Sequence, residues 1–149
     1  MESTIRRGAL REERSTERDI IGTVNDLLGQ VNLELVREGT ATTDGAGTWT
    51  TVVTLPDMPD DCAWRIRVEA VGFGSGRRSY HEVAALWYRA GAGATQEGAD
   101  QAVFTAIESH VGIDVRTQAS TNAVSVQVRD DNAGEAMTFH VKVTAKERK

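Results

Sequence analysis

The side chains that most often bind metals or carry protons are scarce in this chain. The three histidines, His81, His110 and His140, have no second histidine, cysteine or carboxylate pair at the spacing of a metal site. His140 falls on the polar side of an alternating segment, and His81 follows Tyr80 where a strand would begin. We therefore predict that both side chains are imidazoles on the solvated surface.

Two acidic clusters offer the oxygen ligands that calcium prefers, but neither has the spacing of a calcium loop. Aspartate and asparagine also bond to nearby backbone amides in turns, which explains both clusters without a metal. We expect no metal and no other cofactor, with calcium as the minor alternative. The clusters are Asp130, Asp131 and Asn132 in one place and Asp57, Asp60 and Asp61 in the other.

The single cysteine, Cys62, excludes an intramolecular disulfide and any cysteine-rich metal site. A nucleophilic thiol needs a neighbouring base and a positive environment, whereas Asp60 and Asp61 precede this one. We predict a half-buried structural thiol. Because no catalytic triad or ligand cluster converges elsewhere, we expect a protein that is not an enzyme.

A glycine-rich run, Gly72 to Gly76, superficially resembles a loop that cradles phosphate. Such loops open a helix, whose N-terminus binds the anion, but this run joins two alternating segments. We predict a flexible hairpin loop over 72–79. Its two arginines, Arg77 and Arg78, are candidates for contact with an acidic surface.

Three tryptophans raise the possibility of stacking against a sugar. Trp64 is one of the apolar residues that occupy every second position of its segment, which predicts that it lies in the core. Trp49 begins another alternating segment. Trp87 and Tyr88 are consecutive, so one of these two rings must face outward on a regular strand. An outward ring indicates either a protein interface, which we favour, or a platform for a ligand.

The composition is that of one soluble globular domain. The chain has 149 residues, 40% hydrophobic and 26% charged, and includes 16 valines and 16 threonines, which favour strands. The net charge of −5 disfavours a nucleic-acid partner. No apolar stretch is long enough to span a membrane, so we expect no membrane insertion, and the charged start does not resemble a signal peptide.

The first part of the chain differs from the rest. Its first nineteen residues mix arginine with acidic residues and predict an arm that is ordered only against a partner. A short helix is expected over 16–28, ending at Gly29, with one apolar stripe. That stripe either packs on the domain or forms a short bundle around an oligomer axis. Its members are Ile20, Val24, Leu27, Leu28 and Val31.

From Gln30 onward the apolar period changes to two, which is typical of strands. Turn signals separate the alternating segments, with loops or turns expected at 39–47, 72–79 and 91–98. This pattern predicts an all-β, antiparallel β-sandwich of about eight strands over 30–149, preceded by the arm and helix of 1–29. The strands are expected near 31–36, 49–55, 64–70, 80–89, 103–107, 113–117, 124–128 and 137–144.

Four consecutive segments resemble a β-sandwich of tailed-bacteriophage virion proteins, a domain often found at the C-terminal end of tail fibres and trimeric appendages. Their order carries the resemblance, which covers about two thirds of the chain. We expect the topology of the sandwich to be jelly-roll-like. The segments are TWTTVVTLPD (48–57), WRIRVEAVGFGSG (64–76), YHEVAALWYRAGAGATQEG (80–98) and NAVSVQVRDDNAGEAMTFHVKVTAKE (122–147).

The resemblance implies a structural virion component, such as a tail-fibre, appendage or decoration-type protein, assembled in the host cytoplasm. Because no long shaft precedes the sandwich in the sequence given, a small appendage, decoration protein or adaptor fits better than a fibre. We expect a homotrimer that contacts other virion proteins through its N-terminal arm. The alternative is a module that binds a host-surface glycan through Trp87, Tyr88 or Trp49.

Overall fold

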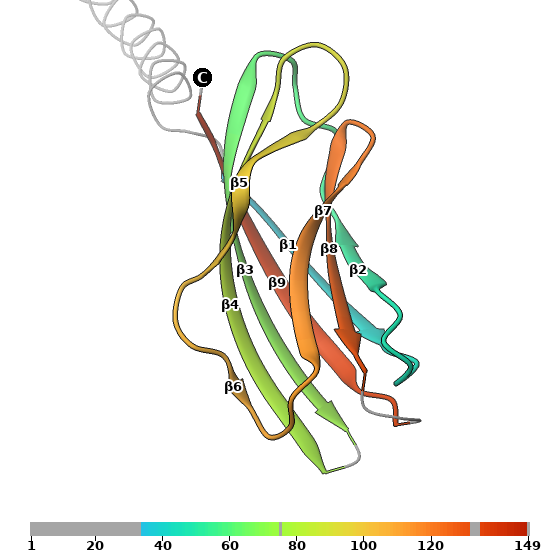
Figure 1. Ribbon diagram of the computed structural model, residues 1–149. Helices are drawn as coiled ribbons and strands as arrows, with labels where there is room; N and C mark the ends of the chain where they lie inside the picture. The colour runs from blue at the N-terminus through green and yellow to red at the C-terminus, as the bar shows by residue number, and fades with distance from the viewer. Residues whose placement is uncertain (1–33, 75, 132–134, 149) are drawn as a thin grey trace, which may run out of the picture. The chain divides into compact units, whose positions relative to one another are not determined.

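The computed structural model describes residues 34–74, 76–131 and 135–148, and this part of the chain consists of strands and their connections (Figure 1). The expected arm and helix of 1–29, including the apolar stripe from Ile20 to Val31, lie outside the described residues. The strands are β1 (Glu34–Thr42), β2 (Thr50–Thr54), β3 (Cys62–Gly74), β4 (Arg77–Arg89), β5 (Thr95–Ala102), β6 (Ile107–Glu108), β7 (Ile113–Ser120), β8 (Ala123–Asp130) and β9 (Thr138–Arg148).

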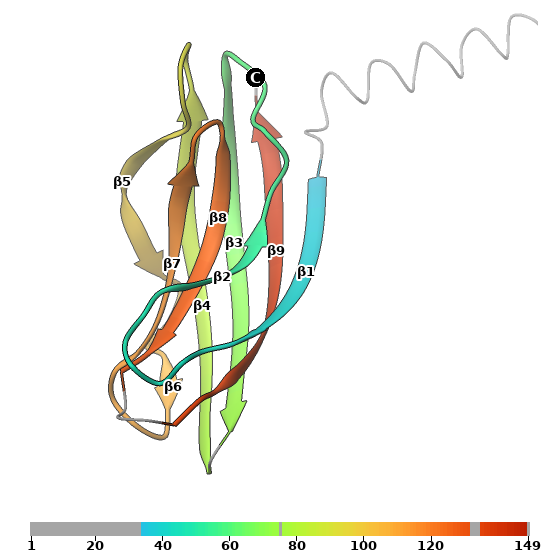
Figure 2. The ribbon, with the colours of Figure 1, turned by 90° about the vertical axis from the view of Figure 1, so that its right-hand side faces the viewer.

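These strands form two antiparallel sheets that face each other (Figure 2). The large sheet has the order β1-β9-β3-β4-β5, with β6 also paired to β4, and the small sheet has the order β2-β8-β7. Every strand pair is antiparallel. The predicted all-β, two-sheet antiparallel architecture is therefore confirmed for the described residues.

The core lies between the two sheets and follows from the two-residue period of the sequence. On β3, Trp64, Ile66 and Val68 are at most 2% exposed, whereas the arginines between them face solvent. Val126 of β8 and Phe139 of β9 are fully buried from the facing sides. Each such side chain contributes roughly 1.5–3 kcal/mol when fully buried, so the alternation specifies which face of each sheet points inward.

Several strands extend into segments that we predicted to be loops. β1 continues to Thr42 through the expected loop at 39–47 because Gly39 lets it pass close to the small sheet. A Cβ atom at Gly39 would lie 2.6 Å from the carbonyl oxygen of Val52. Likewise, the expected loop at 72–79 is a tight hairpin, in which β3 ends at Gly74 and β4 begins at Arg77.

The region between β4 and β7 also differs from the prediction. The expected turn at 91–98 contains the start of β5, and the expected strand at 103–107 is reduced to β6. Residues 103–112, which we call the strap, carry the chain from β5 in the large sheet to β7 in the small sheet (Figure 1). The strap bonds to β4 through Val103 N to Glu82 O (2.9 Å) and Ser109 N to Arg78 O (2.9 Å).

Candidate functional site

The side of the large sheet that is turned away from the small sheet carries several exposed apolar and charged side chains. We call the outward residues of β1, β9, β3 and β4 the outer face. Strand register arranges them in rows across the sheet, each row about 7 Å from the next. The rows are Thr42, Thr138, Phe73 and Arg78; Thr40, His140, Val71 and Tyr80; Glu38, Lys142, Glu69 and Glu82; Val36, Thr144, Arg67 and Ala84; and Glu34, Lys146, Arg65 and Leu86.

Large apolar side chains are exposed on this face. Val36, Val71, Phe73 and Leu86 are 43–47% exposed, although each belongs to a regular strand. The Phe73 ring stacks on His140 with centroids 5.7 Å apart, which confirms the predicted surface position of His140. Val71 and Phe73 are neighbours on β3, whereas Val36 and Leu86 lie on β1 and β4. Exposed apolar groups on a sheet mark an interaction surface, so the outer face is our main candidate.

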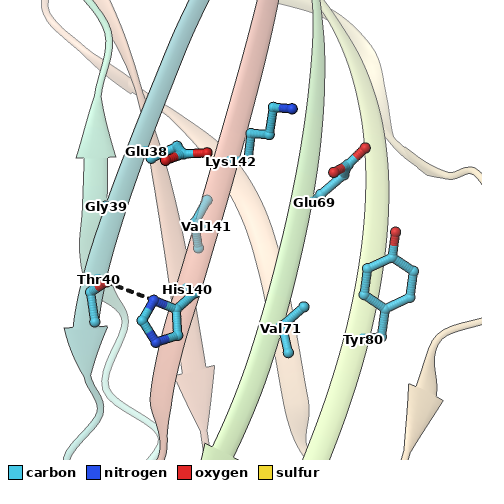
Figure 3. Close-up of a pocket in the computed structure, with 9 residues that line it drawn as sticks. All are labelled: Glu38, Gly39, Thr40, Glu69, Val71, Tyr80, His140, Val141 and Lys142. Carbon is cyan, nitrogen blue, oxygen red and sulfur yellow. Dashed lines mark hydrogen bonds between the residues drawn. The ribbon is translucent and has the colours of Figure 1, made fainter.

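A shallow hollow of about 470 Å³ opens on the outer face (Figure 3). Its apolar floor includes Val71, and Tyr80 stands at one side. Polar groups surround this floor, with Glu38 and Glu69 on either side of Lys142 in the strand register. Such a surface can bind hydroxyl groups or charged groups while it packs against an apolar patch. Two further hollows of about 430 Å³ each open on the same face.

Several charges on the outer face have no ion-pair partner of their own. Among the described side chains, no opposite charge lies within 4.0 Å of the charged atoms of Glu38, Glu69, Arg65, Lys142 or Lys146. Arg67, by contrast, pairs with the buried carboxylate of Glu82. The face therefore presents charges of both signs to solvent, and these are available to a partner.

A second cluster, which the sequence did not reveal, lies at the small sheet. The guanidinium groups of Arg116 and Arg129 lie 4.0 and 4.7 Å from the centroid of the Trp49 ring. Arg129 also bonds to the Asp114 carboxylate, and Arg116 donates to the side-chain oxygen of Gln127. Because two cations already cover the Trp49 ring, this ring is a poor platform for a sugar.

The prediction that His81 is a solvated surface imidazole is wrong. His81 is 7% exposed and faces the core. It lies six residues before the buried Trp87 on β4, and residues an even number of positions apart face the same side of a strand. Its Nε2–H points at the Glu108 carboxylate (2.6 Å) and the Ile113 carbonyl (3.2 Å). Since both neighbours accept hydrogen bonds, the proton belongs on Nε2. His81 thus fastens the strap to β4 rather than serving a ligand.

The two arginines of the glycine-rich hairpin occupy opposite faces of β4. Arg78 is exposed on the outer face, as expected of a residue that contacts a partner surface. Arg77 is only 5% exposed and pairs with Asp130 and with Glu135 (2.7 Å) inside the domain. The expectation that Arg77 contacts an external acidic surface is therefore wrong, because its charge is neutralised within the fold.

The remaining predicted residues divide between the core and the outer face. Trp64 and Trp87 are buried, at 2% and 3% exposed, and Trp87 Nε1 donates to Thr117 Oγ1 (2.9 Å). Tyr88 is half-buried on the outward side, so it is the outward ring of the pair. Cys62 is 5% exposed, and its thiol lies 2.9 Å from the Pro59 carbonyl oxygen. This agrees with a structural thiol.

Metal sites, membrane spans and known relatives provide no further assignment. Within the described residues, no group of three or more His, Cys, Asp or Glu side chains is arranged to hold a metal ion. Across the same residues, no helix is long and apolar enough to cross a membrane. No family model, curated protein or solved structure matches the chain.

Proposed function

We propose that this protein is a structural, non-enzymatic component of a tailed phage or phage-like particle, of the tail-fibre, appendage or decoration type. It would assemble as an oligomer in the host cytoplasm and remain in the virion. The observation that carries the proposal is the outer face, where a regular sheet exposes Val36, Val71, Phe73 and Leu86 beside charges that form no ion pair with the other described side chains. A surface of this kind is suited to docking against another protein subunit.

The N-terminal segment would fix the sandwich to the particle. In this proposal, the charged residues of the first nineteen positions contact other virion proteins. The stripe of Ile20, Val24 and Leu27 would bring copies of the chain together, as in a trimer. The jelly-roll-like topology also stays a prediction. The pairings β1–β9 and β2–β8 favour it, whereas the hairpins β3–β4 and β7–β8 keep consecutive strands in one sheet.

Purified particles test this function directly. We expect mass spectrometry of particles from cells that express the full chain to detect it in stoichiometric amounts. Deletion of residues 1–18 should abolish incorporation while the far-ultraviolet circular dichroism of the sandwich is retained. Particles that lack the full chain, or that incorporate the deletion variant normally, would contradict the proposal.

A second candidate function is binding of a host-surface glycan, and the hollow of Figure 3 favours it. The ring of Tyr80 already stacks on Phe104 with centroids 5.3 Å apart, so Glu69 and Lys142, as an acceptor and donors for hydroxyl groups, would provide most of the contacts. The site would therefore be this hollow rather than the buried Trp87. Chemical-shift changes around Tyr80 on addition of host glycans, lost in Tyr80→Ala, would support this function. Unchanged spectra across a panel of neutral and charged glycans would contradict it.

A further inference from the structure

We propose that the outward side of the small sheet binds a carboxylate side chain from an acidic segment of another protein, and that Arg116 is the residue that holds it. This inference goes beyond the proposed function and does not depend on it, because such a site requires only a protein partner. Three observations carry it. They are the charge of Arg116, which no described carboxylate neutralises, the contacts that fix its guanidinium group, and the polar character of the surrounding surface.

The outward side of the small sheet, which we call the small face, is polar. Figure 2 shows this side, with β8 between β2 and β7 in front of the large sheet. Its side chains alternate along the strands with core residues such as Val126 and Val128. Among the described residues, none of the exposed large apolar side chains lies on β2, β7 or β8. The small face consists of Trp49, Thr51, Thr54, Asp114, Arg116, Gln118, Ser125, Gln127 and Arg129. A partner that docks here is therefore selected by charge and hydrogen bonds.

The charged groups of the small face are two guanidinium groups and one carboxylate. The Arg129 Nε and Nη2 atoms both lie against Oδ2 of Asp114, at 2.8 and 2.7 Å. No carboxylate among the described side chains lies within 4.0 Å of the guanidinium nitrogens of Arg116. The small face thus carries one positive charge in excess, although the chain as a whole has a net charge of −5. Coulomb attraction at this surface therefore favours an anionic group.

The guanidinium group of Arg116 is held in place before any ligand arrives. Its central carbon lies 4.0 Å from the centroid of the Trp49 ring, and its Nε atom donates to Oε1 of Gln127 at 2.9 Å. Within the described residues, its two terminal nitrogens form no hydrogen bond. These two nitrogens form the fork that binds both oxygens of a carboxylate. Because the fork is already oriented, binding costs less side-chain entropy than it would for a mobile arginine.

The same surface is poorly suited to sugars and nucleic acids. Two cations cover the Trp49 ring, so it provides no platform for stacking. The hydroxyl and amide groups nearby already bond to each other, Thr54 to Ser125 (2.9 Å) and Gln127 to Thr51 (3.2 Å). A phosphate backbone would be repelled by the acidic chain. An aspartate or glutamate of a partner protein presents a single carboxylate without either difficulty, so we assign the site to an acidic protein segment.

The experiment titrates the full chain with an acetylated and amidated tetraglutamate peptide. Nitrogen-15 NMR follows the Nε–H group of Arg116 and the indole N–H of Trp49, and fluorescence follows the same ring because Trp64 and Trp87 are buried. We expect saturable shifts at both groups that weaken as sodium chloride is raised. A tetraglutamine peptide of the same length should cause no shift.

Substitutions at position 116 separate the effect of the fork from that of the charge. Arg116→Gln should raise the dissociation constant for tetraglutamate by about 10-fold or more, because it removes a charge-assisted contact. Arg116→Lys should raise it several-fold, since lysine keeps the charge but lacks the planar fork. Arg78→Gln removes an equal charge from an exposed position on the large sheet and should bind as the native chain does. The Trp49 indole provides the readout in each variant, and circular dichroism verifies that each is folded.

A gain of affinity provides the sharpest arm. Asp114→Asn removes the carboxylate that occupies Arg129, so a second guanidinium group becomes available beside Arg116. We expect the dissociation constant for tetraglutamate to fall at least several-fold. Asp57→Asn makes the same change in an exposed turn and should have no effect. A misfolded variant could not bind more tightly, so this result is independent of stability.

Three outcomes would overturn the inference. The absence of a saturable shift with tetraglutamate would show that the small face binds no carboxylate segment. Equal losses in Arg116→Gln and Arg78→Gln would show that attraction is spread over the surface rather than placed at Arg116. Binding of polygalacturonate without binding of tetraglutamate would assign the site to an acidic sugar instead of a protein. Incorporation into particles is measured separately, so none of these outcomes decides the proposed function.

Discussion

Arg77, the first residue of β4, forms an ion pair with Asp130, the last residue of β8, and so connects the two sheets through the interior. Asp130 is fully buried and Arg77 is 5% exposed. The second guanidinium nitrogen reaches Glu135, whose side chain is half exposed, at 2.7 Å. This ion pair thereby fixes the tip of the β3–β4 hairpin to the small sheet.

We predict that Asp130→Asn lowers the free energy of unfolding by about 3 kcal/mol, because it removes the fully buried one of the two carboxylates that neutralise the Arg77 guanidinium and leaves only the half-exposed Glu135. Urea denaturation followed by tryptophan fluorescence measures the change. The double variant Arg77→Met, Asp130→Leu should recover most of the loss, since it removes both charges and retains apolar volume. A single variant as stable as the native protein would contradict a structural role for this pair.

The bond between His81 and Glu108 is expected to hold the strap without controlling global stability. Glu108→Ala removes the acceptor at 2.6 Å, and the remaining backbone bonds of Val103 and Ser109 to β4, with the β6 pairing, should keep the strap closed less often. Hydrogen exchange at the amides of Val103 and Ser109 should accelerate at least several-fold, while amides in the centre of β3 keep their protection. Glu97→Ala, an exposed substitution on β5, serves as the control.

If exchange rose equally in the strap and in β3, the bond would contribute to the whole fold rather than to the strap alone. Unchanged exchange in Glu108→Ala would show that the strap is held by other contacts.

The Trp49 cluster should contribute modestly to stability. Each cation–π contact at a partly exposed site is worth about 0.5–1 kcal/mol, so Trp49→Ala should cost about 1–3 kcal/mol once lost packing is included. Arg116→Lys retains the charge but loses the planar guanidinium and should cost less, about 0.5–1 kcal/mol. Urea unfolding of the two variants provides both values. If Trp49→Ala and Arg116→Lys lowered the free energy of unfolding equally, packing of the Trp49 ring would contribute nothing beyond its contact with the Arg116 guanidinium.

The carboxylate of Asp60 accepts hydrogen bonds from the Gly91 amide (2.7 Å) and the Asp61 amide (3.0 Å). These bonds favour the ionised form, so the pKa of Asp60 lies below its ordinary value of 3.8, with the Gly91 bond as the largest cause. The stabilisation is therefore present above the ordinary pKa and is lost as the pH falls through the lowered pKa.

Carbon-detected NMR titration should find the Asp60 carboxyl titrating below pH 3.8, with the Gly91 amide shift following the same transition. In Asp60→Asn, the Gly91 amide should no longer follow that transition. A titration at or above the ordinary pKa in the native chain would contradict the hydrogen-bonded geometry.

The sequence predicted the central strands well because their alternation is set by burial. Trp64, Ile66 and Val68 on β3 have the same two-residue period in sequence and structure. β5 was missed because its polar and glycine-containing segment has no apolar alternation. Its pairing with β4 depends on tertiary contacts, including a register shift between Ala84 and Leu86.

The sequence did contain a pattern that could have placed His81 and Arg77 correctly. Counting back from Trp87 in steps of two leads to His81 and then to Arg77, so an inward Trp87 requires both to face inward along a regular strand. The outer face had no comparable signal. Glu38, Lys142 and Glu69 are far apart in the chain, and only the register of three strands brings them into one row.

The position of β9 has a consequence for how the domain is made. β9 lies between β1 and β3 in the large sheet, so among the described strands residues 34–42 pair with residues 138–146 alone. During synthesis, β1 can therefore pair with β9 only after nearly all of the domain has left the ribosome. Such distant pairing slows folding relative to a chain of local hairpins. A chain that terminates before β9 would leave two strand edges open, and we expect aggregation or proteolysis to remove it.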